Sequence, residues 1–115
     1  MPKVTSHAKK RLKQRSGISK GSADKIAARA LGWGITHAQA RGTLKLLMDA
    51  LYLDYKAANN LRFYGGKVFI FHSQTLITVI PVKHGILDHL EDNVEPEALE
   101  LYQKRMKAKR RKKES

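Results

Sequence analysis

The chain contains no cysteine and only three prolines among its 115 residues. Without cysteine it has neither a disulfide framework nor a thiolate that could bind a metal ion. Its apolar runs are short, and none approaches the roughly 20 apolar residues that a membrane-spanning helix needs. The basic N-terminal residues also lack the apolar core of a secretory signal. These absences predict a cytoplasmic protein that has no membrane partner.

Acidic residues are scarce as well, with 10 of them against 23 lysines and arginines and a formal net charge of +13. Residues 1–29 hold nine basic side chains and one acidic one, and residues 104–113 hold eight basic side chains and no acidic one. Clustered Lys and Arg bind nucleic acid by releasing counterions from its phosphates. The distribution predicts RNA, another nucleic acid or a nucleoprotein such as the ribosome as partner. The alternative is a solvated surface that only maintains solubility.

Aromatic and β-branched residues are concentrated in residues 61–82. Two short polar interruptions there, Gly65-Gly66 and Ser73-Gln74, suit two-residue hairpin turns. We therefore expect antiparallel strands over 61–64, 67–72 and 75–82. With this register, the face toward the helices carries Leu61, Phe63, Val68, Ile70, His72, Thr75, Ile77 and Val79. The other, partly open face carries Arg62, Tyr64, Lys67, Phe69, Phe71, Leu76, Thr78 and Ile80.

Capping residues and helical periodicity predict three helices before the strands. The first is expected over 7–16, with Ser6 as its N-cap and Gly17 ending it. The second is expected to run from Ser19 or Ser22 to Leu31.

A third helix is expected over 37–56, because Thr36 and Gln39 form a capping-box pattern, and Gly42 would lie inside it. Residues 82–93 suggest one short helical turn, and Pro96 suits the first position of a basic C-terminal helix. The order predicts an α+β fold, with three N-terminal helices packed on a three-stranded antiparallel sheet and a basic C-terminal helix after it. We expect a single domain over 1–103 and a basic tail or helix extension over 104–115.

The sequence carries no phosphate-binding loop or metal-binding motif, since Gly65-Gly66-Lys67 lacks Walker spacing and the five histidines lack HxH or HExxH spacing. We therefore predict no cofactor and no metal. What remains is metal-free chemistry on RNA, whose 2′-hydroxyl is an internal nucleophile. Such a reaction needs only groups that transfer protons and cations that stabilise the phosphorane.

Candidate catalytic residues are His7, Arg11 and Arg15, spaced by four along one helical face, together with Tyr64 on the open sheet face. His7 would transfer the proton, the arginines would neutralise the phosphate, and Tyr64 would stack on a base or donate a hydrogen bond. An equally weighted interpretation is that the first helix only grips phosphate. The candidate nucleic-acid-binding residues are Lys10, Lys13, Arg62, Lys67, Lys104, Arg105, Lys107, Lys109, Arg110, Arg111, Lys112 and Lys113.

The opening HAKKRLKQRSGI resembles the H-x(3)-R-x(3)-R-x-G-I opening of small phage and mobile-element proteins, some of which are grouped with the RelE/BrnT-like ribonuclease toxins. The segment LRFYGGKVFIFHSQTLITVIPV is similar to their late antiparallel strands. The resemblance covers about residues 5–82. It implies an α+β fold, a basic RNA-facing surface and functional roles for His7, Arg11 and Arg15. The helical section over 36–56 is longer here than is usual in that family.

Together these features predict a basic RNA-binding protein of phage or mobile-element type. In its catalytic version it would be a metal-independent, RelE-like endoribonuclease toxin. The alternative is a non-catalytic nucleic-acid-binding regulator, or an inhibitor that blocks a host nucleoprotein complex; an antidote or host protein would then be a further partner. DNA binding through the second and third predicted helices as a helix-turn-helix is weaker, because the third helix is apolar where a recognition helix exposes polar side chains.

Overall fold

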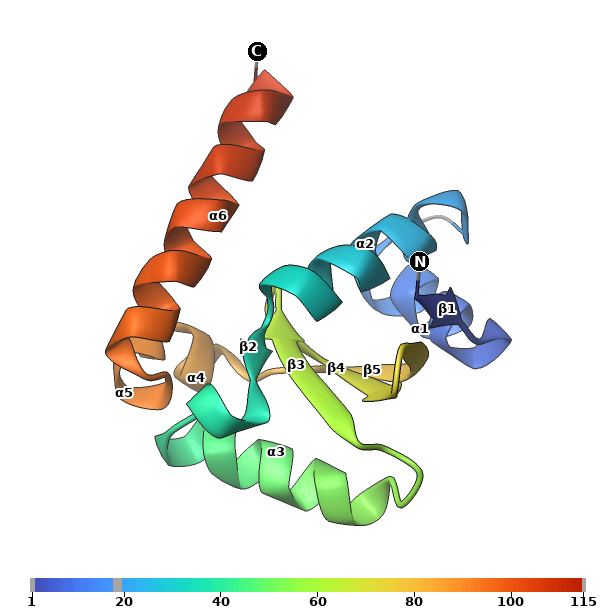
Figure 1. Ribbon diagram of the computed structural model, residues 1–115, viewed down its shortest axis with the longest axis horizontal. Coiled ribbons are helices and arrows are strands. Elements are labelled where there is room, and N and C mark those ends of the chain that lie inside the picture. The colour runs from blue at the N-terminus through green and yellow to red at the C-terminus, as the bar shows by residue number, and fades with distance from the viewer. Residues whose placement is uncertain (1, 18–19, 115) are drawn as a thin grey trace.

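The computed structural model describes residues 2–17 and 20–114, and its central element is one five-stranded mixed sheet with helices around it (Figure 1). The α+β class is therefore confirmed. The elements in chain order are β1 (Lys3–Val4), α1 (Ser6–Ser16), α2 (Lys20–Trp33), β2 (Ile35–Thr36), the 3₁₀ turn η1 (His37–Gln39), α3 (Gly42–Asp54), β3 (Asn60–Tyr64), β4 (Lys67–His72), β5 (Thr75–Pro81), α4 (His84–Leu87), α5 (Leu90–Asn93) and α6 (Pro96–Glu114).

The three predicted strands form the centre of the sheet, whose order is β1-β5-β4-β3-β2. The prediction of three antiparallel strands was incomplete, because β1 pairs in parallel with β5 at one edge and β2 pairs antiparallel with β3 at the other. Each of these edge strands has two residues. A strand of two residues shows no period-two alternation, so the sequence pattern gave no sign of either.

Both predicted hairpin turns are confirmed. Tyr64 pairs with Lys67 across Gly65-Gly66, and His72 pairs with Thr75 across Ser73-Gln74. The two glycines have φ values of 57° and 80°, and Ser73 also has a positive φ of 55°. Positive φ at both central positions gives a turn whose twist matches that of the flanking strands, which is why Gly-Gly is suited to the first hairpin.

The predicted register of β5 was wrong beyond the second hairpin. Phe71 pairs with Leu76 but Ile70 pairs with Thr78, so a bulge leaves Ile77 without a directly opposite partner. Val68 consequently lies opposite Ile80, and not opposite Val79 as two regular strands would require. One additional residue in β5 thus exchanges the two faces of its second half.

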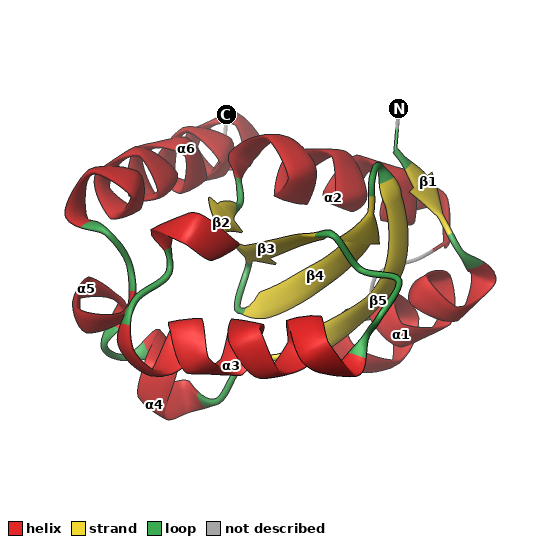
Figure 2. Cartoon of the chain, turned by 60° about the horizontal axis from the view of Figure 1, so that its bottom comes forward, coloured by secondary structure: helices red, strands yellow, loops and turns green. Residues whose placement is uncertain are grey.

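The prediction of a partly open sheet face was also wrong. Neighbouring residues of β4 point to opposite faces, yet Val68, Phe69, Ile70 and Phe71 are all at most 2% exposed. Figure 2 shows why, since α2 and α3 lie on opposite sides of the sheet. The helices before the strands therefore divide between the two faces, and only His72, at the end of β4, is exposed in that strand.

The predicted capping box of Thr36 and Gln39 is present, but it closes the turn η1 and does not begin α3. The helix begins at Gly42, which has a positive φ of 53° and follows a short break in the helical conformation after η1. Its first turn is satisfied from a distant part of the chain, because the backbone N–H of Leu44 donates to Oδ1 of the buried Asn93 at 3.0 Å. The third helix is therefore Gly42–Asp54 and not 37–56.

The first helix has Thr5 as its N-cap, and not Ser6 as predicted from the sequence. The Thr5 hydroxyl accepts a hydrogen bond from the backbone N–H of Ala8 and donates one to the carbonyl oxygen of Ile77 in β5, both at 3.1 Å. One side chain thus begins α1 and fastens it to the sheet. Gly17 ends the helix in the left-handed conformation, as predicted.

We expect Thr5→Ala to lower the free energy of unfolding by about 1–2 kcal/mol, because it removes a helix cap and a hydrogen bond to the sheet. Urea denaturation measures the loss. Ser6→Ala is the matched control, since Ser6 is exposed inside the first turn, and it should change stability by less than about 0.5 kcal/mol. Equal losses in the two variants would contradict the assignment of the cap.

Candidate nucleic-acid interface

The basic N-terminal segment forms α1 and α2, and the basic C-terminal segment lies in α6, which meets the C-terminal end of α2; these three helices are called the basic side. α1 packs against α2 and β5, while α6 begins beside α5 and runs past the C-terminal end of α2 (Figure 1). Arg105 of α6 contacts α2 directly, because its Nη1 donates to the carbonyl oxygen of Gly32 at 3.2 Å. The C-terminal residues expected to be a tail or a helix extension continue α6 as far as Glu114.

Carboxylates are concentrated elsewhere. The ion pairs between described side chains are His37–Asp49, Arg41–Glu95, Lys45–Asp49, His89–Glu91 and Lys104–Glu100. None of these pairs involves a described cation of α1 or α2, although both helices are rich in lysine and arginine. Positive charge on this side is therefore not neutralised within the described part of the chain, and a polyanion would meet it directly.

The structure places His7 and Arg11 in contact on α1, as their spacing predicted. Nε of Arg11 donates a long hydrogen bond of 3.5 Å to Nε2 of His7, and His7 is exposed. Lys10 and Lys13 are exposed on the same helix. Arg15 was expected beside this pair, but its side chain lies outside the described residues.

Tyr64 lies in the core. Its side chain is 2% exposed, and its ring packs edge-on against Phe69 and Tyr102 at centroid distances of 6.1 and 6.2 Å. Burial raises the pKa of its phenol, and the positive charge of Arg29 in α2 opposes that shift. Tyr64 is thus separated from solvent, whereas His7 and Arg11 lie on the exposed side of α1.

Arg62 and Lys67 are half-buried cations near the β3–β4 turn. Nε of Arg62 donates to Oδ1 of Asn60 at 2.9 Å, and Nζ of Lys67 donates to the carbonyl oxygen of Gly65 at 3.3 Å. Neither has a carboxylate within ion-pair distance among the described residues. Burial lowers the pKa of both groups, because each loses solvation of its charge without gaining an acidic partner.

The basic residues of α6 fall into three groups. Lys104 is paired with Glu100 at 3.3 Å, Arg105 binds α2, and Lys107 is exposed. Five further predicted contacts have side chains outside the described residues, namely Lys109, Arg110, Arg111, Lys112 and Lys113. Their backbone continues α6 as far as Glu114.

A histidine–carboxylate pair that sequence analysis missed lies on the other side of the molecule. Nε2 of His37 donates to Oδ1 of Asp49 at 2.6 Å, and Nζ of Lys45 donates to Oδ2 at 2.8 Å. The hydrogen bond from Lys45, followed by that from His37, lowers the pKa of Asp49. No sequence motif marks this pair, because His37 in η1 and Asp49 in α3 are 12 residues apart.

One exposed group could offer ligands to a cation, because His89, Glu91 and Asp92 hold ligand atoms within 4.8 Å of one another. It does not coincide with the basic side of the molecule. Exposed acidic groups of this kind are common in proteins without a metal ion, and the set has no cysteine or buried ligand.

No family model, curated protein or solved structure with which the chain was compared matches it. No helix in the described residues is both long enough and apolar enough to span a membrane.

The lowered pKa of Asp49 predicts an acid-dependent loss of stability. A carboxyl with a depressed folded-state pKa stabilises the fold above its unfolded pKa, near 3.9, and loses that contribution as pH falls through the folded value. We expect Asp49→Asn to flatten the dependence of Tm on pH below about pH 4, where only the wild type still loses this term. Thermal unfolding followed by circular dichroism between pH 2 and pH 7 measures it, with exposed Asp54→Asn as control. Parallel profiles for Asp49→Asn and the wild type would contradict the prediction.

Proposed function

We propose that this protein binds RNA in the cytoplasm through the side formed by α1, α2 and the basic end of α6. The observation that carries the proposal is the contact between Arg105 and Gly32, residues 73 apart in sequence. It joins the basic helix α6 to the C-terminal end of α2, the helix that follows α1 in the chain. The resemblance to small phage and mobile-element proteins of RelE/BrnT-like type is a second, independent support.

The physical basis of binding would be phosphate neutralisation. Cations without a carboxylate partner gain most from a polyanion, since each contact releases condensed counterions and needs no internal ion pair to break. Such contacts hold RNA in register and are largely independent of base sequence. Lys10 and Lys13 on α1 are of this kind, because both are exposed and neither is in an ion pair among the described residues.

In the catalytic version of this proposal, His7 removes the proton from a 2′-hydroxyl. Arg11 beside it would neutralise charge on the phosphorane, and its hydrogen bond to Nε2 of His7 would have to break for that nitrogen to accept the proton. The 2′-oxygen attacks phosphorus, the bond to the 5′-oxygen breaks, and the departing oxygen takes a proton. Tyr64, buried in the core, is poorly placed to supply that proton, so an exposed group would have to do so.

The non-catalytic alternative needs only the cationic surface. A regulator, or an inhibitor that occupies the RNA-binding channel of a host nucleoprotein, would use the same cations without a proton-transfer step. The burial of Tyr64 favours this version over the catalytic one, because it removes one of the four candidate catalytic residues from the surface.

We expect the double variant Lys10→Gln/Lys13→Gln to weaken RNA binding about tenfold and to reduce the slope of log K against log salt by about 1.4, for two phosphate contacts to a single strand. Fluorescence anisotropy with a labelled oligonucleotide at several salt concentrations measures both. The matched control is Lys45→Gln/Lys56→Gln, which removes the same charge from α3 and the residues just after it. Equal effects of the two double variants would mean that net charge, and not this surface, drives binding.

A cleavage assay separates the two versions. In the catalytic version, labelled RNA is cut in the presence of EDTA by the wild type, and His7→Ala lowers the rate by at least about 100-fold while RNA affinity stays within about twofold. Exposed His84→Ala is the control for loss of an imidazole. Tight binding without any cleavage by the wild type would assign the protein to the non-catalytic class.

A further inference from the structure

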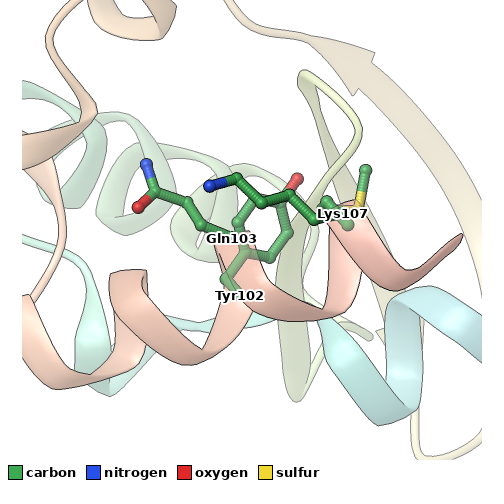
Figure 3. A pocket seen from close by; sticks show the side chains of 4 residues that line it. Tyr102, Gln103 and Lys107 are labelled. Atoms are coloured by element: carbon green, nitrogen blue, oxygen red, sulfur yellow. The ribbon is translucent and has the colours of Figure 1, made fainter. Parts of the chain in front are cut away.

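α6 carries a pocket that was not predicted from the sequence. Its volume is about 320 Å³, and its lining residues are Tyr102, Gln103, Met106 and Lys107. Figure 3 shows the Lys107 side chain extending back along the helix toward Gln103. The lining thus combines an ammonium group, an amide that both donates and accepts, a thioether and a phenol.

The pocket is held in place by the β3–β4 turn. Tyr102 is 6% exposed, and its hydroxyl accepts a hydrogen bond of 2.9 Å from the backbone N–H of Gly65. Its ring also packs against Phe63 and Tyr64 at centroid distances of 5.9 and 6.2 Å. These contacts fix Tyr102, and with it this part of α6, against the sheet.

The charge around the pocket is positive and has no internal partner. Lys107 supplies the positive charge of the lining, whereas Lys67 does not line the pocket and donates to the carbonyl oxygen of Gly65 in the turn that binds Tyr102. Among the described residues neither Lys67 nor Lys107 has a carboxylate within ion-pair distance, whereas Lys104, three residues before Lys107, is paired with Glu100. This arrangement favours an anionic ligand.

We propose that this pocket takes one nucleotide of single-stranded RNA. Its phosphate would contact Lys107, its base would lie against Met106, and the amide of Gln103 would bind the base edge or the ribose hydroxyl. The volume is at the lower end of the range of about 300–1,000 Å³ for small-molecule sites, which suits one nucleotide. The strand must be single, because a paired and stacked base cannot enter a pocket. This inference rests on the proposed RNA binding and names where a base is read.

Methionine methyl NMR tests the pocket directly. The chain has three methionines, of which Met106 lines the pocket and Met48 is fully buried on α3. Protein labelled with ¹³C at the methionine methyl groups would be titrated with the 5′-phosphorylated dinucleotides pUpU and pApA. We expect the Met106 resonance to shift in a saturable way and the Met48 resonance to stay unchanged. A Met106 resonance that does not move at millimolar dinucleotide would overturn the proposal.

Two single-lysine variants test the phosphate contact. We expect Lys107→Gln to weaken binding of a single-stranded oligonucleotide about fivefold and to reduce the salt slope by about 0.7, the value for one contact to a single strand. Lys56→Gln removes the same charge from an exposed residue just after α3, away from this surface, and should change affinity less than twofold. Unchanged Met48 resonances verify that both variants are folded.

The outcomes separate this inference from the proposed function. Equal losses for the two variants, with oligonucleotide binding intact in the wild type, would overturn the pocket and leave RNA binding standing. A wild type that binds no oligonucleotide would overturn the proposed function. In that case a saturable Met106 shift with dinucleotide would still support a nucleotide pocket, and the absence of a shift would overturn it.

Discussion

The packing of Tyr102 against the β3–β4 turn is the contact on which the arrangement of this molecule depends. Eight basic residues between 104 and 113 follow it in α6, and like charges at that density repel one another. The buried ring and its hydrogen bond to Gly65 give the start of the helix a fixed position, and Arg105 then reaches Gly32 in α2. Local apolar packing thereby holds a helix whose charge would otherwise oppose its approach to the basic N-terminal helices.

The charges of α6 also agree with the direction of its helix dipole. Its first turn contains Glu97, with Glu100 following, whereas its last turns are basic, and each sign is favoured at the end where it occurs. Most of the acidic residues lie between 49 and 100, on and near α3, α4, α5 and the start of α6. The net charge of +13 is therefore not spread evenly along the chain.

Sequence reasoning succeeded where the deciding interaction is local and failed where it is not. The Gly65-Gly66 turn fixed its own register, and the i, i+4 spacing of His7 and Arg11 placed them in contact. The bulge at Ile77 and the capping of α3 by Asn93, 49 residues from Leu44, depend on tertiary packing that periodicity does not encode. Tyr64 was misplaced for the same reason, because the pattern of β3 contains no sign that a helix covers its polar end.

The positions of these residues suggest which of them could distinguish one RNA base from another. The cations of α1 and α2 offer point charges, which suit phosphate and carry little information about bases. Reading a base needs a group that donates and accepts at fixed positions, next to an apolar surface that tolerates an unstacked ring. Among the described residues of the basic side, Gln103 beside Met106 meets both needs in one pocket. Affinity and selectivity would then reside in different elements, the first distributed over three helices and the second confined to the part of α6 that Tyr102 fixes.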